Sequence, residues 1–169
     1  FRRYASMLKK NSEHSKELVL LIVNISVSLK NTLQALRQND DSLPMIRKFP
    51  KTYQDPESFI KNDVYPDLSK TLSTRDDDTI VSRIHLSEAL VNLVLGLDKE
   101  ETTSLLPGIL TSVCQVLRSR SEELREAVRK NLANLASILG PQYLSFIIKE
   151  LKSALTRGSQ IHVLSYSLH

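Results

Sequence analysis

The sequence predicts an all-α protein, and three observations support this prediction. Aromatic residues make up only 5% of the chain and tryptophan is absent, whereas strands favour aromatic and β-branched side chains. Leucine, isoleucine and valine recur at three- and four-residue spacing over long segments, which is the period of an amphipathic α-helix. The glycines and prolines lie mostly between these segments, where turns are expected.

Residues 1–37 are expected to form a helical block, in which residues 15–37 make one long helix. Polar residues such as Asn24 and Lys30 interrupt its most apolar stretch well before the about 20 residues that span a bilayer. We therefore expect a buried helix and no membrane partner. A helix that is apolar around most of its circumference is packed on two sides. Its apolar positions are Leu18, Val19, Leu20, Leu21, Ile22, Val23, Ile25, Val27, Leu29, Leu33 and Leu36.

Residues 38–58 are predicted to be a proline-containing loop or linker. This segment carries Pro44, Pro50 and Pro56 and shows no sustained helical period. Connections of this length without regular structure are unusual inside compact domains. The segment therefore marks the expected boundary between the helical block and residues 59–169.

From residue 59 onward, helix start signals recur at matching places. Asp63 lies three residues before Pro66, and Ser104 lies three residues before Pro107. This spacing suits a capping residue followed by a proline in the first helical turn, where the missing N–H costs no intrahelical hydrogen bond. We therefore expect one helix to begin at each of these sites.

Partner helices are expected to begin near Asp78 and Ser121. The resulting helix pairs cover about residues 63–97 and 104–139, and a third, truncated pair covers 141–169 after a Gly-Pro turn. Units of this length are close to the about 40 to 47 residues of HEAT and armadillo repeats. The prediction is HEAT-like helical-hairpin repeats that form part of an α-solenoid. Because the apolar pattern continues to His169, we expect the chain to be an excerpt from a longer protein.

A cluster of basic residues lies around the start of the helix that follows Ser121. One interpretation is a ridge that contacts RNA phosphates, which position a backbone without reading its sequence. The other is a solvated helix face on which the basic side chains pair with Glu122, Glu123 and Glu126. The basic residues are Arg118, Arg120, Arg125, Arg129 and Lys130.

The sequence offers no catalytic, cofactor-binding or metal-binding signature. The four histidines are scattered without helical pairing, and no glycine belongs to a phosphate-binding loop. Cys114 lies in an apolar run and is expected to be a small core residue of an intracellular protein. Ser73 and Thr74 precede three aspartates, a pattern that suits an acid-directed kinase but equally a capped helix start and a solvated loop.

Four stretches carry a resemblance to a known family: 117–129, 139–144, 148–151 and 155–166. They are similar to the "down-regulated in metastasis" family, whose members are very large HEAT-repeat proteins of the small-subunit processome. The resemblance implies a non-catalytic scaffold of small ribosomal subunit (40S) biogenesis and pre-rRNA processing. It implies a nucleolar, and therefore nuclear, location, and partners that include processome proteins, pre-rRNA and small nucleolar RNA. It also implies that Arg157 acts at a turn, by bonding carbonyl groups or contacting a neighbour.

A different class of function stays open, because helix pairs alone are shared widely. A generic HEAT-repeat adaptor, such as a nuclear transport receptor or a phosphatase scaffold, would have the same periodicity. The turns Gly-Pro-Gln-Tyr (140–143) and Thr-Arg-Gly (156–158) favour the processome family. An enzyme is not expected, because no nucleophile is paired with a base.

Overall fold

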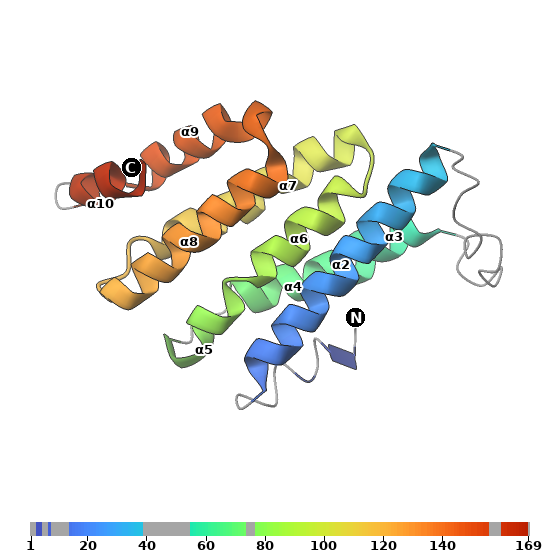
Figure 1. Cartoon of the computed structure of the whole chain (residues 1–169), viewed down its shortest axis with the longest axis horizontal. Coiled ribbons are helices and arrows are strands. Elements are labelled where there is room, and N and C mark those ends of the chain that lie inside the picture. The colour runs from blue at the N-terminus through green and yellow to red at the C-terminus, as the bar shows by residue number, and fades with distance from the viewer. Residues whose placement is uncertain are drawn as a thin grey trace.

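The protein is built from two layers of helices, as a computed structural model of the chain shows (Figure 1). The structure describes residues 3, 4, 7, 14–38, 55–73, 77–155 and 160–168. Helices α2, α6 and α8 lie side by side in one layer, and α3, α4 and α7 lie behind them (Figure 1). No strand occurs among the described residues. The predicted all-α class is confirmed.

The described helices follow one another in hairpins. Two short segments interrupt or precede the α-helices: a π-helical turn, Ile60–Val64, and a 3-10 turn, Pro141–Tyr143. The α-helices are α2 (Ser15–Arg37), α3 (Pro56–Phe59), α4 (Tyr65–Leu72), α5 (Asp77–Arg83), α6 (Leu86–Leu95), α7 (Lys99–Val116), α8 (Glu122–Leu139), α9 (Leu144–Ala154) and α10 (Gln160–Leu168).

Hydrogen bonds between neighbouring hairpins join residues about 40 positions apart in the sequence. The Tyr65 hydroxyl donates to the Leu105 carbonyl at 3.2 Å, a separation of 40 residues. One hairpin later, the Thr111 hydroxyl donates to Glu150 at 2.7 Å, a separation of 39 residues. A constant sequence separation between stacked contacts is what a helical repeat produces, because each unit touches its neighbours in the same way.

The first hairpin begins earlier than expected. Pro56 starts α3, and the Asp55 side chain caps it by accepting from the Ser58 amide at 2.9 Å. Asp63 is therefore not a cap, and Pro66 lies inside a continuous helical run. A proline there removes one N–H, and the preceding π-turn, in which the Tyr65 amide donates to the Ile60 carbonyl, accommodates the change.

The expected helix start at Ser104 is wrong. Helix α7 begins at Lys99, and the Asp98 side chain caps it by accepting from the Glu101 amide at 2.8 Å. Pro107 lies inside this helix. The helical turn before the proline is tied to the end of α6, since the buried Thr102 hydroxyl donates to the Val94 carbonyl at 2.8 Å.

The partner helices start close to the predicted residues. Ser121 is the N-cap of α8, and its hydroxyl accepts from the Leu124 amide at 3.3 Å. Helix α5 begins at Asp77, but the chain then breaks at Ile84 and His85 before α6. The Ser87 amide donates to the Ile84 carbonyl at 3.1 Å, so the break is a tightened turn within the hairpin.

The spacing of Leu144, Ile148, Leu151 and Leu155 predicts one apolar stripe on α9 and the residue after it, and of these the structure buries Leu151 and Leu155. Leu144 is 49% exposed, whereas Ile147 is 4% exposed and Leu151 is 4% exposed. Leu144 directly follows the 3-10 turn Pro141–Tyr143 and lies outside the buried stripe. Helix α9 ends at Ala154 and not at Arg157, which lies outside the described residues.

Helix α2 is packed on one side, which corrects the expected two-sided burial. Ile22 and Leu33 are buried against the neighbouring hairpin, while Leu20 is 61% exposed and Leu21 and Leu36 are also exposed. By length and composition alone, α2 is apolar enough to cross a membrane, because its polar interruptions are mostly uncharged. Such a test is also passed by core helices of other proteins, and α2 packs against α5 and α6.

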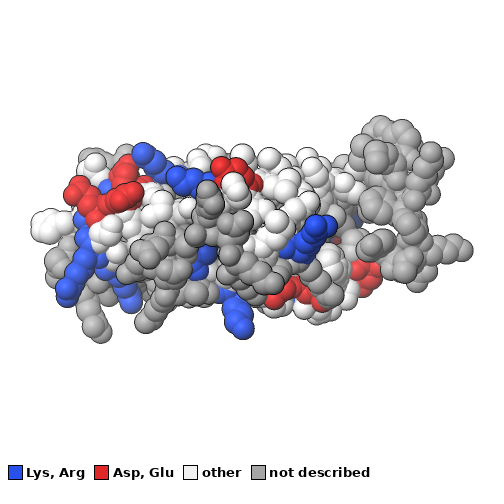
Figure 2. All heavy atoms as spheres, turned by 90° about the horizontal axis from the view of Figure 1, so that it is seen from below, with Lys and Arg blue, Asp and Glu red and all other residues white. Residues whose placement is uncertain are grey.

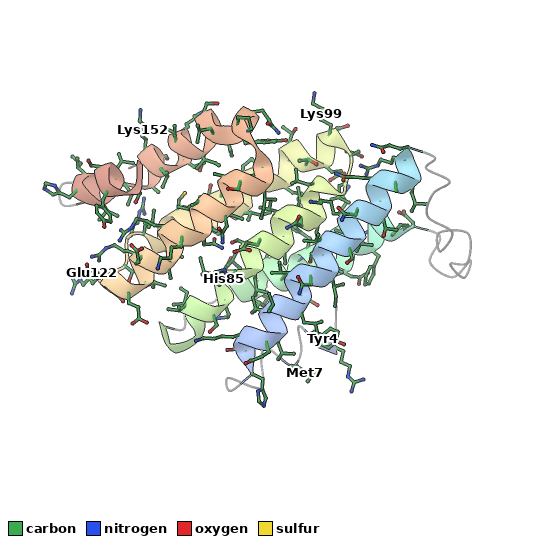
Figure 3. All side chains as sticks on the ribbon, in the orientation of Figure 1. Tyr4, Met7, His85, Lys99, Glu122 and Lys152 are labelled. Atoms are coloured by element: carbon green, nitrogen blue, oxygen red, sulfur yellow. The ribbon has the colours of Figure 1, made fainter. Side chains whose placement is uncertain are left out.

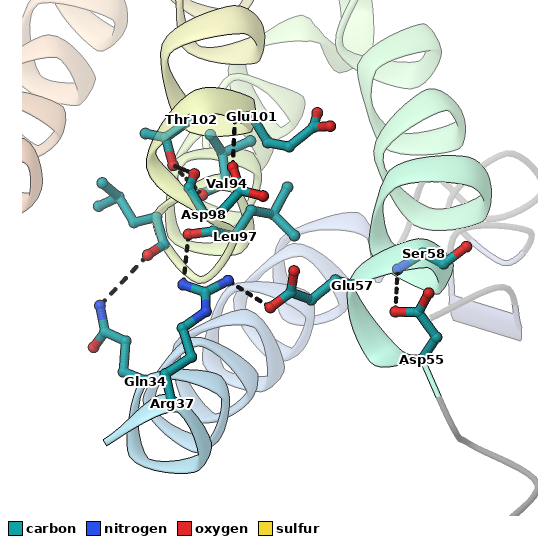
Figure 4. Close-up of polar contacts among 11 residues, drawn as sticks. Gln34, Arg37, Asp55, Glu57, Ser58, Val94, Leu97, Asp98, Glu101 and Thr102 are labelled. Atoms are coloured by element: carbon teal, nitrogen blue, oxygen red, sulfur yellow. Dashed lines mark hydrogen bonds and ion pairs between the residues drawn. The ribbon is translucent and has the colours of Figure 1, made fainter. Parts of the chain in front are cut away.

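Polar contacts hold the end of α2 to the turn between α6 and α7 (Figure 4). The Arg37 guanidinium donates to the Leu97 carbonyl at 2.7 Å and to the Glu57 carboxylate at 2.5 Å. Gln34 reaches the Leu95 carbonyl at 3.4 Å. The bonds made by Arg37 join α2 to α3 and to the turn between α6 and α7. Residues 39–54, most of the predicted linker, lie outside the described residues.

We predict opposite effects for two glycine substitutions. Gly140 has φ +84°, and an added Cβ would lie 2.7 Å from the Gln142 side chain, so Gly140→Ala should lower the free energy of unfolding by about 1–3 kcal/mol. Gly108 is helical, and its added Cβ meets only the Tyr65 hydroxyl at 3.7 Å. Gly108→Ala should therefore stabilise by up to about 1 kcal/mol. Urea unfolding followed by circular dichroism measures both, and equal effects would contradict the turn geometry.

Candidate functional site

The predicted basic cluster lies at the turn between α7 and α8 and along the first half of α8. This is the end of the molecule at which Glu122 is labelled in Figure 3. Six residues were expected to contact RNA or a neighbour: the five of the cluster and Arg157. The structure describes the five, and their surroundings differ. Arg118, Arg125 and Arg129 make internal contacts, and the pairing of Arg129 with Glu126 agrees with the second interpretation of the cluster.

Arg118 acts as a cap for the neighbouring hairpin. Its Nε donates to the carbonyl of Ala154 at 2.7 Å, at the last residue of α9. The final carbonyls of a helix have no partner within the helix, and a cation there also suits the helix dipole. Arg118 therefore ties the second hairpin to the third.

Arg125 stabilises the turn that leads into its own helix. Its Nη1 donates to the Ser119 carbonyl at 3.0 Å and to the Arg120 carbonyl at 2.9 Å. The turn residues have no regular backbone partners, so a side-chain donor satisfies carbonyls that would otherwise need water. Arg125 is half-buried by this contact.

Arg129 is held from two sides. It donates twice to the Glu126 carboxylate, at 3.1 and 2.7 Å, and its guanidinium carbon lies 4.4 Å from the centre of the Tyr166 ring on α10. The hydrogen bond from Arg129 lowers the pKa of Glu126. The side chain of Arg129 is only 15% exposed, so this arginine links α8 to α10 more than it faces solvent.

Arg118, Arg120 and Lys130 are the exposed members of the cluster, and of these Arg118 is bonded to the Ala154 carbonyl. Arg120 is exposed, and the Lys130 side chain is 74% exposed, with only a loose contact of 3.8 Å to Glu126. Figure 2 shows lysine and arginine atoms beside aspartate and glutamate atoms, without one continuous basic surface on the face in view. Arg157 lies outside the described residues, and its predicted role at a turn stays a prediction.

A buried polar network between α6 and α8 was not predicted. Glu88 Oε1 lies 2.7 Å from His85 Nδ1 and accepts from the Asn131 side chain at 2.9 Å. The Ser87 hydroxyl donates to Asn131 at 2.8 Å. Ser87 and Asn131 are fully buried. His85 lies at the break between α5 and α6 (Figure 3). The signal in the sequence was Asn131 in the middle of an otherwise apolar helix stripe.

The surroundings of Glu88 act on its pKa in opposite directions. Burial favours the neutral acid, but the hydrogen bonds and the charge of His85, together with donors from Asn134 and Asn131, outweigh burial and lower the pKa below 4.5. The carboxylate is thus held ionised between the two helices. This network joins α6 to α8, which belong to successive hairpins and lie in the same layer.

The thiol and the potential metal ligands of the described residues do not form a reactive or metal-binding site. Burial, with a smaller contribution from the charge of Glu150, raises the pKa of the Cys114 thiol to about 12, and its side chain is fully buried. Within the described residues, no group of three or more His, Cys, Asp and Glu side chains could hold a metal ion. A pocket of about 300 Å³ lies beside α3 and the start of α7, lined by acidic residues and Lys61, which pairs with Glu101.

Comparison with known proteins shows the family of this chain. The family model described as the U3 small nucleolar RNA-associated protein 20 domain matches residues 73–169. The chain belongs to this family. It is 54% identical over 168 residues to U3 small nucleolar RNA-associated protein 20 of Saccharomyces cerevisiae, and 36% identical over 180 residues to the protein of that name of Schizosaccharomyces pombe. The resemblance to the "down-regulated in metastasis" family is thereby confirmed.

Each alignment covers 99% of this chain but only 7% of the relative. The match to the U3 small nucleolar RNA-associated protein 20 domain begins at Ser73 and includes α5 to α10. It therefore includes the whole basic cluster and the polar network of Glu88. The alignments to the two yeast proteins extend over almost all of the chain, including α2.

We predict that the arginines of this family domain divide into structural and solvent-facing residues. Arg118→Ala and Arg125→Ala should each lower the free energy of unfolding by about 1 kcal/mol, because each leaves backbone carbonyls without a donor. Arg120→Ala and Lys130→Ala serve as matched controls and should change it by less than about 0.5 kcal/mol. Thermal and urea unfolding measure the four variants, and a uniform effect would contradict the division.

We also predict a pH-dependent contribution from Glu88. Its pKa is lower in the folded protein than its ordinary value, so its stabilisation is fully present above pH 4.5 and is lost as the pH falls through the folded pKa. Glu88→Gln should therefore destabilise the protein at pH 7, and the difference from the parent should shrink as the pH is lowered from 5 to 3. Unfolding free energies across this range measure it. A difference that stays constant with pH would show that the charge of Glu88 does not stabilise the network.

Proposed function

We propose that the chain is part of a non-catalytic scaffold in small ribosomal subunit (40S) biogenesis and pre-rRNA processing, within the small-subunit processome. Membership of the U3 small nucleolar RNA-associated protein 20 family supports the assembly. The observation that supports scaffolding is the use of side chains: Arg118, Arg125 and Arg129 bind other helices or turns of the same chain. Such contacts fix the order and spacing of hairpins and leave extended helix surfaces for other molecules.

A scaffold also agrees with the chemistry of the described residues. The lone thiol is buried with a raised pKa, and the close contact of His85 with Glu88 belongs to the network that joins α6 to α8. Catalysis would need such a pair to face a nucleophile or a substrate site. In this proposal, the chain positions other components of the particle and catalyses no reaction.

The proposed partners follow from the names of the relatives. Both yeast relatives are named as associated with U3 small nucleolar RNA. We propose that this chain lies in the same kind of particle, together with other processome proteins, pre-rRNA and small nucleolar RNA. Its proposed location is accordingly the nucleolus, within the nucleus. The match of the family domain favours this proposal over a transport receptor or phosphatase adaptor, which would share only the helix pairs.

Affinity purification of the tagged full-length protein tests this proposal. The expected result is enrichment of pre-rRNA and U3 small nucleolar RNA, measured by sequencing the recovered RNA against an untagged control. Co-sedimentation of the protein with large pre-ribosomal particles should be lost after nuclease treatment that breaks those particles. Recovery of transport cargo or a phosphatase without ribosomal RNA would refute the proposal.

A further inference from the structure

The turn between α7 and α8 presents an accessible serine, Ser121, at the end of the molecule where Figure 3 labels Glu122. Ser121 is exposed, and its backbone is extended, with φ −67° and ψ 121°. Residues 117–120 before it lie between the helices, and Glu122 and Glu123 after it are exposed. A modifying enzyme has to enclose the side chain and its flanking backbone, and an exposed turn allows this.

The sequence of this turn has the charge pattern that basic-directed protein kinases select. Arg118 lies three residues before Ser121 and Arg120 lies one residue before it. Kinases choose their substrates by charge pattern, and carboxylates bind the planar guanidinium group well. Both arginines are exposed. The bond from Arg118 to the Ala154 carbonyl uses Nε, which is one of the five donors that an arginine carries.

Ser119, the other serine of the turn, lacks this combination. It is half-buried, and the residue three positions before it is Val116. Its hydroxyl accepts from the Ser121 amide at 3.1 Å. Glu122 lies three residues after Ser119, which suits an acid-directed kinase. The two serines therefore distinguish the two classes of kinase, and the exposed one has the arginines.

A phosphate on Ser121 would find donors at the start of α8. The first amides of a helix have no partner within the helix, and negative charge is favoured beside them. Arg125 lies one turn further along α8, and its Nη1 reaches back to the Ser119 and Arg120 carbonyls at 3.0 and 2.9 Å. This contact holds a guanidinium at the same turn, and phosphate oxygens are strong acceptors for arginine.

The net charge of the basic cluster is small enough for one phosphate to cancel it. The cluster has five cations, and Glu122, Glu123 and Glu126 offset three of them, which leaves a formal charge of +2. A phosphoserine adds about −1.5 to −2 at neutral pH. One phosphate therefore removes almost all of the positive charge that this part of the surface offers to an anion.

We propose that Ser121 is a phosphorylation site for a basic-directed protein kinase, and that its phosphate is bound at the start of α8 and cancels the net charge of the basic cluster. The kinase transfers the γ-phosphoryl group of ATP to Ser121 Oγ. A P–Oγ bond forms, the bond between the γ-phosphorus and the oxygen of ADP breaks, and the hydroxyl proton is released. The site does not depend on the proposed function, because the charge change weakens attraction to an anionic partner of any kind.

Phosphopeptide mapping of the full-length protein tests the site. Protein purified from growing cells with phosphatase inhibitors should carry phosphate on Ser121, and a purified kinase that selects arginine three residues before serine should add it there with ATP. Ser121→Asn should abolish this signal, and because asparagine caps a helix about as well as serine, the variant stays folded. Ser119→Ala is the matched control and should keep the signal. Arg118→Ala should slow the reaction by about 10-fold, with thermal melts to verify its fold.

Hydrogen exchange of the same protein, measured by mass spectrometry, tests how the phosphate is held. Exchange at the start of α8 should be slower after phosphorylation than in the mock-treated protein, because phosphate oxygens accept from the first amides. Three outcomes would overturn the proposal: phosphate on Ser119 and not on Ser121, a Ser121 without phosphate in the protein from cells, or unchanged or faster exchange at the start of α8 after phosphorylation.

Discussion

Burial of α6 is the constraint on which the other helices depend. Eight of its ten residues are buried, and it packs against α2, α4, α7 and α8. Large fully buried side chains such as Leu86, Leu90 and Leu93 each contribute about 1.5–3 kcal/mol relative to exposure. Because one helix supplies the core for both layers, a change in its rotation would displace all four neighbours. The break at Ile84 and His85 matters for this reason, since it sets the direction in which α6 enters the core.

Polar contacts then decide how the packed helices align. Apolar burial is non-directional, so it does not by itself choose one axial position of α8 along α6. The bonds from Asn131 to Glu88 and from Ser87 to Asn131 are lost if α8 shifts by one turn. A buried donor or acceptor without a partner costs about 1–3 kcal/mol, which penalises the shifted arrangement. The same reasoning applies to α7 and α9, where the Thr111 hydroxyl donates to Glu150.

The sequence predicted the fold class and the helix caps that depend on local chemistry, but it misplaced starts that depend on tertiary contacts. Ser121 caps α8 as expected because its serine precedes two glutamates and an apolar period. Pro66 and Pro107 were both taken as helix starts; Pro66 lies in the first turn of α4, which continues the helical run from Pro56, whereas Pro107 lies inside α7. A proline signals the loss of one N–H, and only the surrounding packing determines whether the helix ends there or bends and continues. Asp55 and Asp98, the actual caps, gave the same local signal as other aspartates.

The candidate site shows a similar limit for charged residues. A run of arginines specifies charge, but the partner of each guanidinium is set by helix ends and turns that are distant in sequence, as Ala154 is from Arg118. Arginine has five donors in a planar fork, so it binds carbonyls at a turn as readily as phosphates. Arg118 and Arg125 are committed to carbonyls, and Arg129 to a carboxylate and a ring. The charge that remains for an external anion is therefore smaller than the composition of the cluster suggests, and it lies at the exposed side chains of Arg118, Arg120 and Lys130.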